Sequence, residues 1–344
     1  MLDEALEQAA LAPYFPQLQT SVSIDARGVK RLHRALDLGH ADITQFFSLA
    51  WGRASDNIPG PAFRDLLLAI AGKPGGLTVS LEILSMRLFA NAADKVKPVP
   101  EVAEAGRVLL DAFEFHGKDQ RTDREDRELG RIAQVSLAGD EGVAIVQRIV
   151  RKMMAAIRSY EISAHDQDDL MTGLLRVHPE VVLDEAFSGD TKAIRNAVQA
   201  FVDFQRFRKN PLEVVPDDIL VAWCERDPSI RYPVMAASAG LFKRPGNDQP
   251  HEWLPLASKL LAKAPDPDAV LKEIVTRLYP TSWSGSLATK LEGRLRLLEN
   301  LPVGDASGLS DALNRAKSVF QQRIARERQN EAAESRARGG RFED

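Results

Sequence analysis

Apolar residues recur along this chain at intervals of three and four, the spacing of an amphipathic helix. Phe63, Leu66, Leu67 and Ile70 form one such stripe, and residues 79–88 are apolar on almost every side. The same spacing predicts further helices at about 29–38, 101–114, 123–137, 143–157, 168–177, 191–207, 217–225, 232–242, 252–263, 267–278, 286–300 and 309–333. The pattern therefore predicts an all-α protein in which the helix at 79–88 lies near the centre of the core.

The signals between these stretches agree with that prediction. Proline and glycine separate the helices, as at 73–76 and 264–267, and the alternating pattern of a strand is nearly absent, Val181–Leu183 being the only short β-rich run. The residues whose side-chain oxygens are placed to cap a first turn are Asp168, Asp190, Asp217, Asp266 and Ser310.

Several segments share one form, in which a helix, a short joint with proline and a second helix follow one another. Phe63–Ala90, Asp217–Phe242 and Trp253–Tyr279 have this form, and the last two begin 36 residues apart, at 217 and 253. That interval is within the range of helix-pair repeats. The sequence thus predicts a degenerate HEAT-like array, an α-solenoid, with an extended C-terminal helix.

The predicted organisation has three regions: an N-terminal helical region at 1–115, a helical-repeat region at 125–303, and a C-terminal helix with a charged tail at 304–344. Trp283 is expected to anchor packing between adjacent units. Residues beyond about 330 are expected to be exposed, because Arg, Glu and Ala dominate there.

Composition narrows the classes of function. Apolar residues make up 44% of the 344 residues and charged residues 27%, which allows a sizeable core. The net charge of −4 disfavours a protein that coats nucleic acid. Cys224 is the only cysteine, so an intrachain disulfide is excluded. With no signal-like N-terminus and no long apolar window, we expect a cytoplasmic protein that does not enter a membrane.

Motifs that resemble chemical sites are better explained by structure. Lys73 after Gly72 is followed by proline, so a helix end explains the pair better than a phosphate loop. His33, Asp37 and His40 share a helix face but no further ligand stands nearby, and the carboxylates at 166–169 lack the glycine of a calcium loop. We therefore expect no catalytic residue, no metal and no cofactor.

Two basic clusters are the candidate binding sites. They comprise Arg148, Arg151, Lys152 and Arg158 in one helix, and Phe204, Arg206, Phe207, Arg208 and Lys209 at the end of another. Cations interleaved with aromatic rings can contact phosphates and stack on bases. The same residues could equally form a solvated helix face beside a buried aromatic pair.

A resemblance adds to this interpretation. The residues that carry it are Ala69–Gly76, Leu81–Leu88, Ser284–Arg294, Ile324–Arg328 and Arg341–Glu343. They resemble segments of the helical C-terminal regions of large bacterial NTPase-type and phage-defence proteins, and the match covers roughly residues 60–344. The resemblance implies a sensor or scaffold in a bacterial defence system and transfers no catalytic residue.

The function predicted from the sequence is that of a non-catalytic helical scaffold that binds a partner protein. The alternative is a nucleic-acid-associated protein that uses the basic clusters at 148–158 and 204–209. An enzyme whose site forms only in the folded chain is a third hypothesis.

Overall fold

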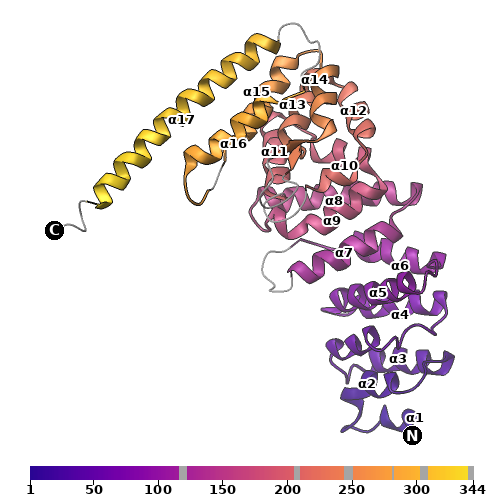
Figure 1. Cartoon of the computed structure of the whole chain (residues 1–344). Coiled ribbons are helices and arrows are strands. Elements are labelled where there is room, and N and C mark those ends of the chain that lie inside the picture. Colours follow the sequence, from indigo (N-terminus) through magenta and orange to yellow (C-terminus); the bar gives the residue numbers. More distant parts are fainter. Residues whose placement is uncertain (116–121, 205–209, 244–250, 281–282, 303–308, 340–344) are drawn as a thin grey trace. The chain divides into compact units, whose positions relative to one another are not determined.

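The computed structural model describes residues 1–344 except 116–121, 205–209, 244–250, 281–282, 303–308 and 340–344, and except the side chains of 122–124, 204 and 337–339. The described residues are nearly all helical, which confirms the all-α prediction (Figure 1). None of the described helices is long and apolar enough to cross a membrane. The chain divides into two compact units, 1–214 and 215–344. The three predicted regions stay a prediction.

The N-terminal unit is a succession of helices stacked along the chain. Its elements are α1 (Leu2–Ala5), η1 (Ala12–Tyr14), α2 (Phe15–Thr20), α3 (Ala26–Leu38), η2 (Ile43–Ala50), α4 (Gly60–Ala71), α5 (Gly76–Ala93), α6 (Pro100–Asp111), α7 (Thr122–Ser136), α8 (Asp140–Arg158), η3 (Ala164–Gln167), α9 (Asp168–Val177), α10 (Pro179–Ala186), α11 (Thr191–Phe204) and η4 (Pro211–Val214).

From α4 onward each helix packs against the second helix along the chain. These pairs are α4 with α6, α5 with α7, α6 with α8, α7 with α9, and α8 with α10. The even-numbered and odd-numbered helices therefore form two layers. Each of the helices α4 to α8 buries apolar side chains in this packing; Leu66, Leu84, Leu109, Ile132 and Met153, one from each helix, are at most 1% exposed. Apolar burial along this interface is the main stabilising contribution.

The crossing of α7 and α9 is unusually close because each helix has a glycine there. A Cβ atom on Gly130 would lie 2.4 Å from the carbonyl oxygen of Asp169, and a Cβ atom on Gly173 would lie 2.6 Å from that of Gly130. The carboxylate of Asp126 accepts hydrogen bonds from the backbone N–H groups of Asp169 and Leu170, both at 2.8 Å. The side chain from α7 thus caps the first turn of α9.

The C-terminal unit repeats the two-layer packing and adds a small hairpin. Its elements are α12 (Asp217–Glu225), α13 (Pro228–Ser238), β1 (Phe242–Lys243), β2 (Glu252–Trp253), α14 (Pro255–Lys263), α15 (Pro267–Arg277), α16 (Leu287–Glu299) and α17 (Leu309–Gly339). Helix α12 packs on α14, and α13 on α15. The strands are antiparallel with Phe242 opposite Trp253, whose indole N–H donates to the carbonyl of Leu297 at 2.7 Å.

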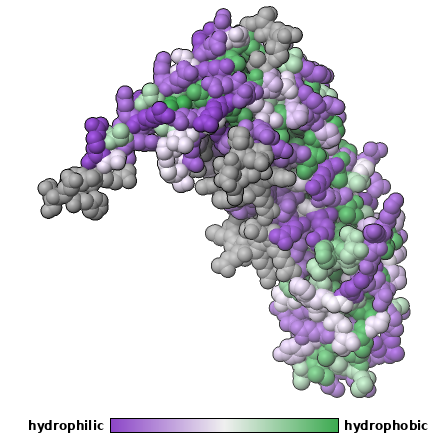
Figure 2. Space-filling view, viewed as in Figure 1, coloured by the Kyte–Doolittle hydropathy of each residue, from purple (hydrophilic) through white to green (hydrophobic). Residues whose placement is uncertain are grey.

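Helix α17 packs on α16 and α15 along a narrow seam. Phe320 is fully buried in this seam and stacks on Tyr279 with 4.4 Å between ring centroids. Further along, the Glu331 carboxylate accepts hydrogen bonds from the Ser286 hydroxyl at 2.8 Å and from the Ala288 N–H at 3.1 Å. The surface of the C-terminal half of α17 is mainly hydrophilic (Figure 2). Residues 332–336 are exposed, as expected beyond about 330, and the rest of the predicted exposed tail lies outside the described side chains.

Some predicted elements were wrong in extent or type. Val181–Leu183 is part of helix α10, because Pro179 begins the helix and Val182 and Leu183 share its buried face. The helix expected at 232–242 is α13, which starts at Pro228 and ends at Ser238. The helix expected at 252–263 begins later, because Glu252 and Trp253 pair as a strand.

Single-residue predictions were also tested. The carboxylates of Asp190 and Asp266 accept N–H groups of the first turns of α11 and α15, as predicted. Asp168, Asp217 and Ser310 lie inside their helices, so the prediction that they are N-caps was wrong. Trp283 is 52% exposed and does not anchor packing, whereas Leu287 to Leu301 contribute buried leucines as expected.

Candidate functional site

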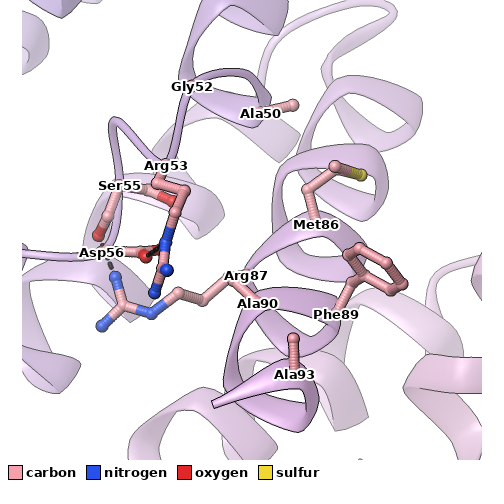
Figure 3. Close-up of a pocket in the computed structure, with 10 residues that line it drawn as sticks. All are labelled: Ala50, Gly52, Arg53, Ser55, Asp56, Met86, Arg87, Phe89, Ala90 and Ala93. Carbon is pink, nitrogen blue, oxygen red and sulfur yellow. Dashed lines mark hydrogen bonds and ion pairs between the residues drawn. The ribbon is translucent and has the colours of Figure 1, made fainter.

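A pocket of about 220 Å³ lies between the turn at 51–58, which follows η2, and the C-terminal half of α5 (Figure 3). It is lined by Ala50, Gly52, Arg53, Ser55, Asp56, Met86, Arg87, Phe89, Ala90 and Ala93. Gly52 and Arg53 have φ angles of 61° and 60°. The left-handed conformation is uncommon for a residue with a side chain, so the position of Arg53 depends on the contacts its side chain makes.

Arg53 occupies the polar side of the pocket. Its guanidinium is hydrogen-bonded to the carboxylates of Asp56, in the same turn, and Asp94, which ends α5. These hydrogen bonds, the one to Asp94 first, raise the pKa of Arg53. The side chain is nevertheless 59% exposed, so its charge faces the solvent at the mouth of the pocket.

Arg87 lies beneath the turn. From α5 its guanidinium donates to the backbone carbonyls of Ser55 and, at 3.4 Å, Ile58, and it lies 5.2 Å from the centroid of the Phe63 ring. Burial is the main cause that lowers the pKa of Arg87; the Asp56 carboxylate acts against it, and the Arg53 charge adds a smaller lowering effect. The Nε–H group is buried and has no hydrogen-bond partner. Arg87 thus holds the turn in place at the cost of a half-buried charge.

The opposite side of the pocket is apolar. Met86 and Phe89 point away from the two guanidinium groups (Figure 3), and Ala50, Ala90 and Ala93 complete the apolar lining. Phe89 is 53% exposed although it lies on a central helix, and the Arg131 guanidinium lies 4.9 Å from its ring centroid. Trp51, which precedes the lining residue Gly52, is exposed to the same extent. Exposed aromatic residues next to a pocket are typical of protein-binding surfaces.

The size of the pocket limits what it can hold. Small-molecule and cofactor sites usually enclose about 300–1,000 Å³. A cavity of about 220 Å³ is therefore better matched to one side chain of a protein partner than to a nucleotide or an organic cofactor.

The first predicted basic cluster lies on α8, where three of its cations bind acidic residues of the same unit. Arg148 forms two hydrogen bonds with the carboxylate of Asp111, at 2.7 and 2.9 Å, and these bonds lower the pKa of that carboxyl. Arg151 binds Glu185 at 2.8 and 3.1 Å, and Lys152 binds Glu114 at 2.6 Å.

These pairs join α8 to the end of α6 and to α10. A phosphate group that binds the cluster must displace the carboxylates, so the geometry gives the nucleic-acid hypothesis no support at this place. Arg158 is exposed at the end of α8. Of the second cluster, Arg206, Phe207, Arg208 and Lys209 lie outside the described residues, as does the side chain of Phe204.

Among the described residues, Asp126, Asp168 and Asp169 bring three metal-ligating groups together, with one carboxylate oxygen of each within 4.8 Å of the others. Both oxygens of Asp126 already accept N–H groups at the N-terminus of α9. The positive end of a helix dipole disfavours a cation. A helix cap built on neighbouring carboxyl groups therefore explains this cluster better than a metal site.

Burial has a larger effect on the pKa of Asp126 than the hydrogen bonds from the N–H groups of Asp169 and Leu170, which lower that pKa. Burial, with a smaller contribution from a hydrogen bond to Asp168, raises the pKa of Asp126 to about 8. At neutral pH the pair therefore holds a proton, which lets two adjacent carboxyl groups lie in the interior without both being charged.

Ser163, His165 and Asp166 form a local chain of hydrogen bonds. The Ser163 hydroxyl lies 2.8 Å from His165 Nδ1, and Nε2 of the same ring lies 3.2 Å from an oxygen of Asp166. All three residues belong to one turn around η3, in which Ser163 is exposed and His165 and Asp166 are half-buried. A nucleophile also needs groups that hold its substrate and stabilise the charge that develops, and this turn does not bring such groups together in the described residues.

Sequence analysis did not identify the pocket. Arg87 and Phe89 follow Arg53 by 34 and 36 residues, so only folding brings them close to it. Two signals were present: a tryptophan beside a glycine in a polar joint, and a phenylalanine two residues after an arginine on an otherwise apolar helix. Neither signal distinguishes a binding surface from core packing before the fold is known.

Fold and site together define a nearly all-helical protein with a small pocket, polar on one side and aromatic on the other, at its N-terminal unit. Comparison with protein-family models, curated proteins and solved structures finds no match for the chain.

Proposed function

We propose that this chain is a non-catalytic helical scaffold that binds a partner protein through the pocket between the 51–58 turn and α5. The observation that carries the proposal is the exposed Phe89, with Trp51 nearby, beside a cavity sized for one side chain. Aromatic residues and arginine dominate the energetics of protein interfaces. The Arg53 and Arg87 guanidinium groups supply the polar part of such a surface.

The architecture that we propose is a degenerate HEAT-like α-solenoid. Its support is the packing of each helix on the second helix along the chain, from α4 to α10 and again from α12 to α15. Repeat proteins of this kind bury each helix pair against its neighbours and bind partners on extended surfaces. A role in a bacterial defence system and a cytoplasmic location rest on sequence resemblance and composition alone.

We expect Phe89→Ala to weaken the complex with the partner roughly tenfold or more, because an exposed aromatic residue beside a pocket is typical of an energetic hot spot. The full chain would first be used to isolate a stoichiometric partner, and the two purified proteins would then be titrated calorimetrically. Trp283→Ala is the matched control, since Trp283 is also half exposed but lies in the other unit. Equal affinities of both variants would exclude the pocket as the docking site, and no stoichiometric partner would exclude the scaffold.

The nucleic-acid alternative predicts a different result. For the chain itself we expect either no binding to random-sequence duplex DNA or binding without a steep dependence on salt, because Arg148, Arg151 and Lys152 already bind carboxylates. Fluorescence anisotropy at several salt concentrations measures this dependence. Affinity that falls steeply with salt, and is lost in the double variant Arg206→Glu, Arg208→Glu, would establish the alternative.

A further inference from the structure

The surface that lines the pocket between the 51–58 turn and α5 is almost wholly apolar, although two arginines border it (Figure 3). Ala50, Met86, Phe89, Ala90 and Ala93 form this apolar lining. Apolar groups gain by leaving water against such a surface, whereas a charged or strongly polar group would lose its hydration there without a hydrogen bond in return. The lining therefore favours an apolar occupant.

The charges around the pocket are balanced within the chain itself. Arg53 is hydrogen-bonded to the carboxylates of Asp56 and Asp94. Asp56 also attracts the charge of Arg87, whose guanidinium donates to two backbone carbonyls. Two guanidinium groups and two carboxylates together carry no net charge. An occupant of either charge would have to compete with these pairs, so the surroundings of the pocket favour an uncharged side chain.

Three of the lining side chains favour an aromatic ring. Hydrogen bonds to a guanidinium lie in its plane, so the two carboxylates bind the edge of Arg53, and its flat face can stack on a ring. The thioether of Met86 can contact a ring through its polarizable sulfur. Phe89, which is 53% exposed, can pack against a second ring in an offset or edge-to-face arrangement.

The volume of the pocket fits one ring. An enclosed apolar cavity of about 150 Å³ holds benzene, and this pocket measures about 220 Å³. We propose that the pocket binds one uncharged aromatic side chain with a single ring, a phenylalanine or a tyrosine, from within the chain of a partner protein. The ring stacks on Arg53 and contacts Met86 and Phe89. The inference rests on the proposed partner-binding function and names the residue class that the pocket recognises.

The test uses the full chain with ¹³C-labelled methionine methyl groups. Met86 lines the pocket, whereas Met153, Met154, Met171 and Met235 are buried in the core and serve as internal references. The probe is N-acetyl-L-phenylalaninamide. Its ring current displaces the signal of a methyl group beside the bound ring, so we expect a saturable shift of the Met86 signal and none of the four reference signals. A dissociation constant on the order of 1 mM is expected for a probe of this size.

Two matched probes separate the properties of the ring. N-acetyl-L-cyclohexylalaninamide has a saturated ring of similar size, so it retains the apolar contact and lacks the aromatic face. We expect it to bind roughly fivefold more weakly. N-acetyl-4-carboxy-L-phenylalaninamide adds a negative charge to the aromatic ring, and the apolar lining and balanced charges should weaken its binding roughly tenfold or more.

A variant that fills the pocket tests the location of the ring. Ala93 lines the pocket and is exposed, so Ala93→Leu places a larger side chain in the space for the ring and should weaken the phenylalanine probe roughly tenfold. Ala92→Leu is the matched control, because Ala92 is exposed on the same helix outside the pocket lining, and it should leave the affinity unchanged.

A second variant tests stacking on Arg53. Arg53→Lys keeps the positive charge between Asp56 and Asp94 but removes the flat face, so it should reduce the preference for the aromatic over the saturated ring. Arg34→Lys is the matched control, since Arg34 is a similarly exposed arginine paired with Glu7, and it should leave this preference unchanged.

Four results would overturn the inference: no shift of Met86, equal or tighter binding of the saturated or the charged probe, an equal loss of affinity in Ala92→Leu and Ala93→Leu, or an unchanged ring preference in Arg53→Lys. The proposed function fails differently. If the probes do not bind but Phe89→Ala still disrupts a partner complex, the scaffold function stands and recognition of an aromatic residue falls. If ring-selective binding is found and no partner is, the pocket chemistry stands and the scaffold function falls.

Discussion

Gly130→Ala is expected to lower the free energy of unfolding by about 3 kcal/mol, the upper end of the usual cost of overpacking. The added methyl carbon would lie 2.4 Å from the backbone carbonyl oxygen of Asp169, a contact that no side-chain rotation can relieve. Helices α7 and α9 would have to separate, which also lengthens the hydrogen bonds from Asp169 and Leu170 to Asp126. The substitution thus weakens both the packing of the two helices and the cap of α9.

Gly293→Ala is the matched control for this change. Gly293 lies within α16, and a Cβ atom built on it meets nothing within 4 Å. The same substitution there should stabilise the protein by roughly 0.5–1 kcal/mol, because alanine favours a helix more than glycine does. Urea unfolding followed by circular dichroism measures both variants, and hydrogen exchange of the α7 and α9 peptides localises the effect. Unchanged exchange in Gly130→Ala would contradict the close crossing.

The stability of the protein is expected to decrease as the pH rises from about 4 to about 8, and Asp126→Asn should remove most of this decrease. Burial raises the pKa of Asp126 from 3.8 to about 8 in the folded chain. Between these two values the folded state binds a proton that the unfolded state has released. Stability from this group is therefore complete below pH 3.8 and is lost as the pH approaches 8.

The size of this loss is on the order of 3 kcal/mol, below the full linkage value because a buried site relaxes when it ionises. Urea unfolding at a series of pH values gives the profile. Asparagine at 126 stays neutral and can still accept one N–H from the first turn of α9. Asp190→Asn is the matched control, since Asp190 also caps a helix but is exposed. A profile that is the same in the wild type and in Asp126→Asn would refute the assignment.

Local features of the fold were predictable from the sequence. Asp190 and Asp266 cap helices through N–H groups three residues away, so a short window contains both partners. Asp126 performs the same task for α9 from another helix, and no local pattern could indicate it. At Val181–Leu183 a local preference was misleading. These residues favour a strand but are helical, because Pro179 begins α10 and the helix buries one face.

The basic cluster on α8 also combines a feature that the sequence shows with one that only the fold determines. Arg148, Arg151 and Lys152 share a helix face in the sequence, as expected of a basic patch. Their partners Asp111, Glu185 and Glu114 are between 34 and 38 residues away and meet them only because α8 packs against α6 and α10. A cluster of cations along one helix is therefore not evidence of an exposed positive surface.

The sequence by itself determined the helical class, most helix limits and the exposed, charged end of the chain, since helical periodicity, proline and glycine signals and local caps act within a few residues. The tertiary structure alone decided which charges are paired, where α7 and α9 touch, and that Arg53, Arg87 and Phe89 surround one pocket. The physical reason is that ion pairing, desolvation and the exposure of an aromatic ring depend on neighbours supplied by other helices.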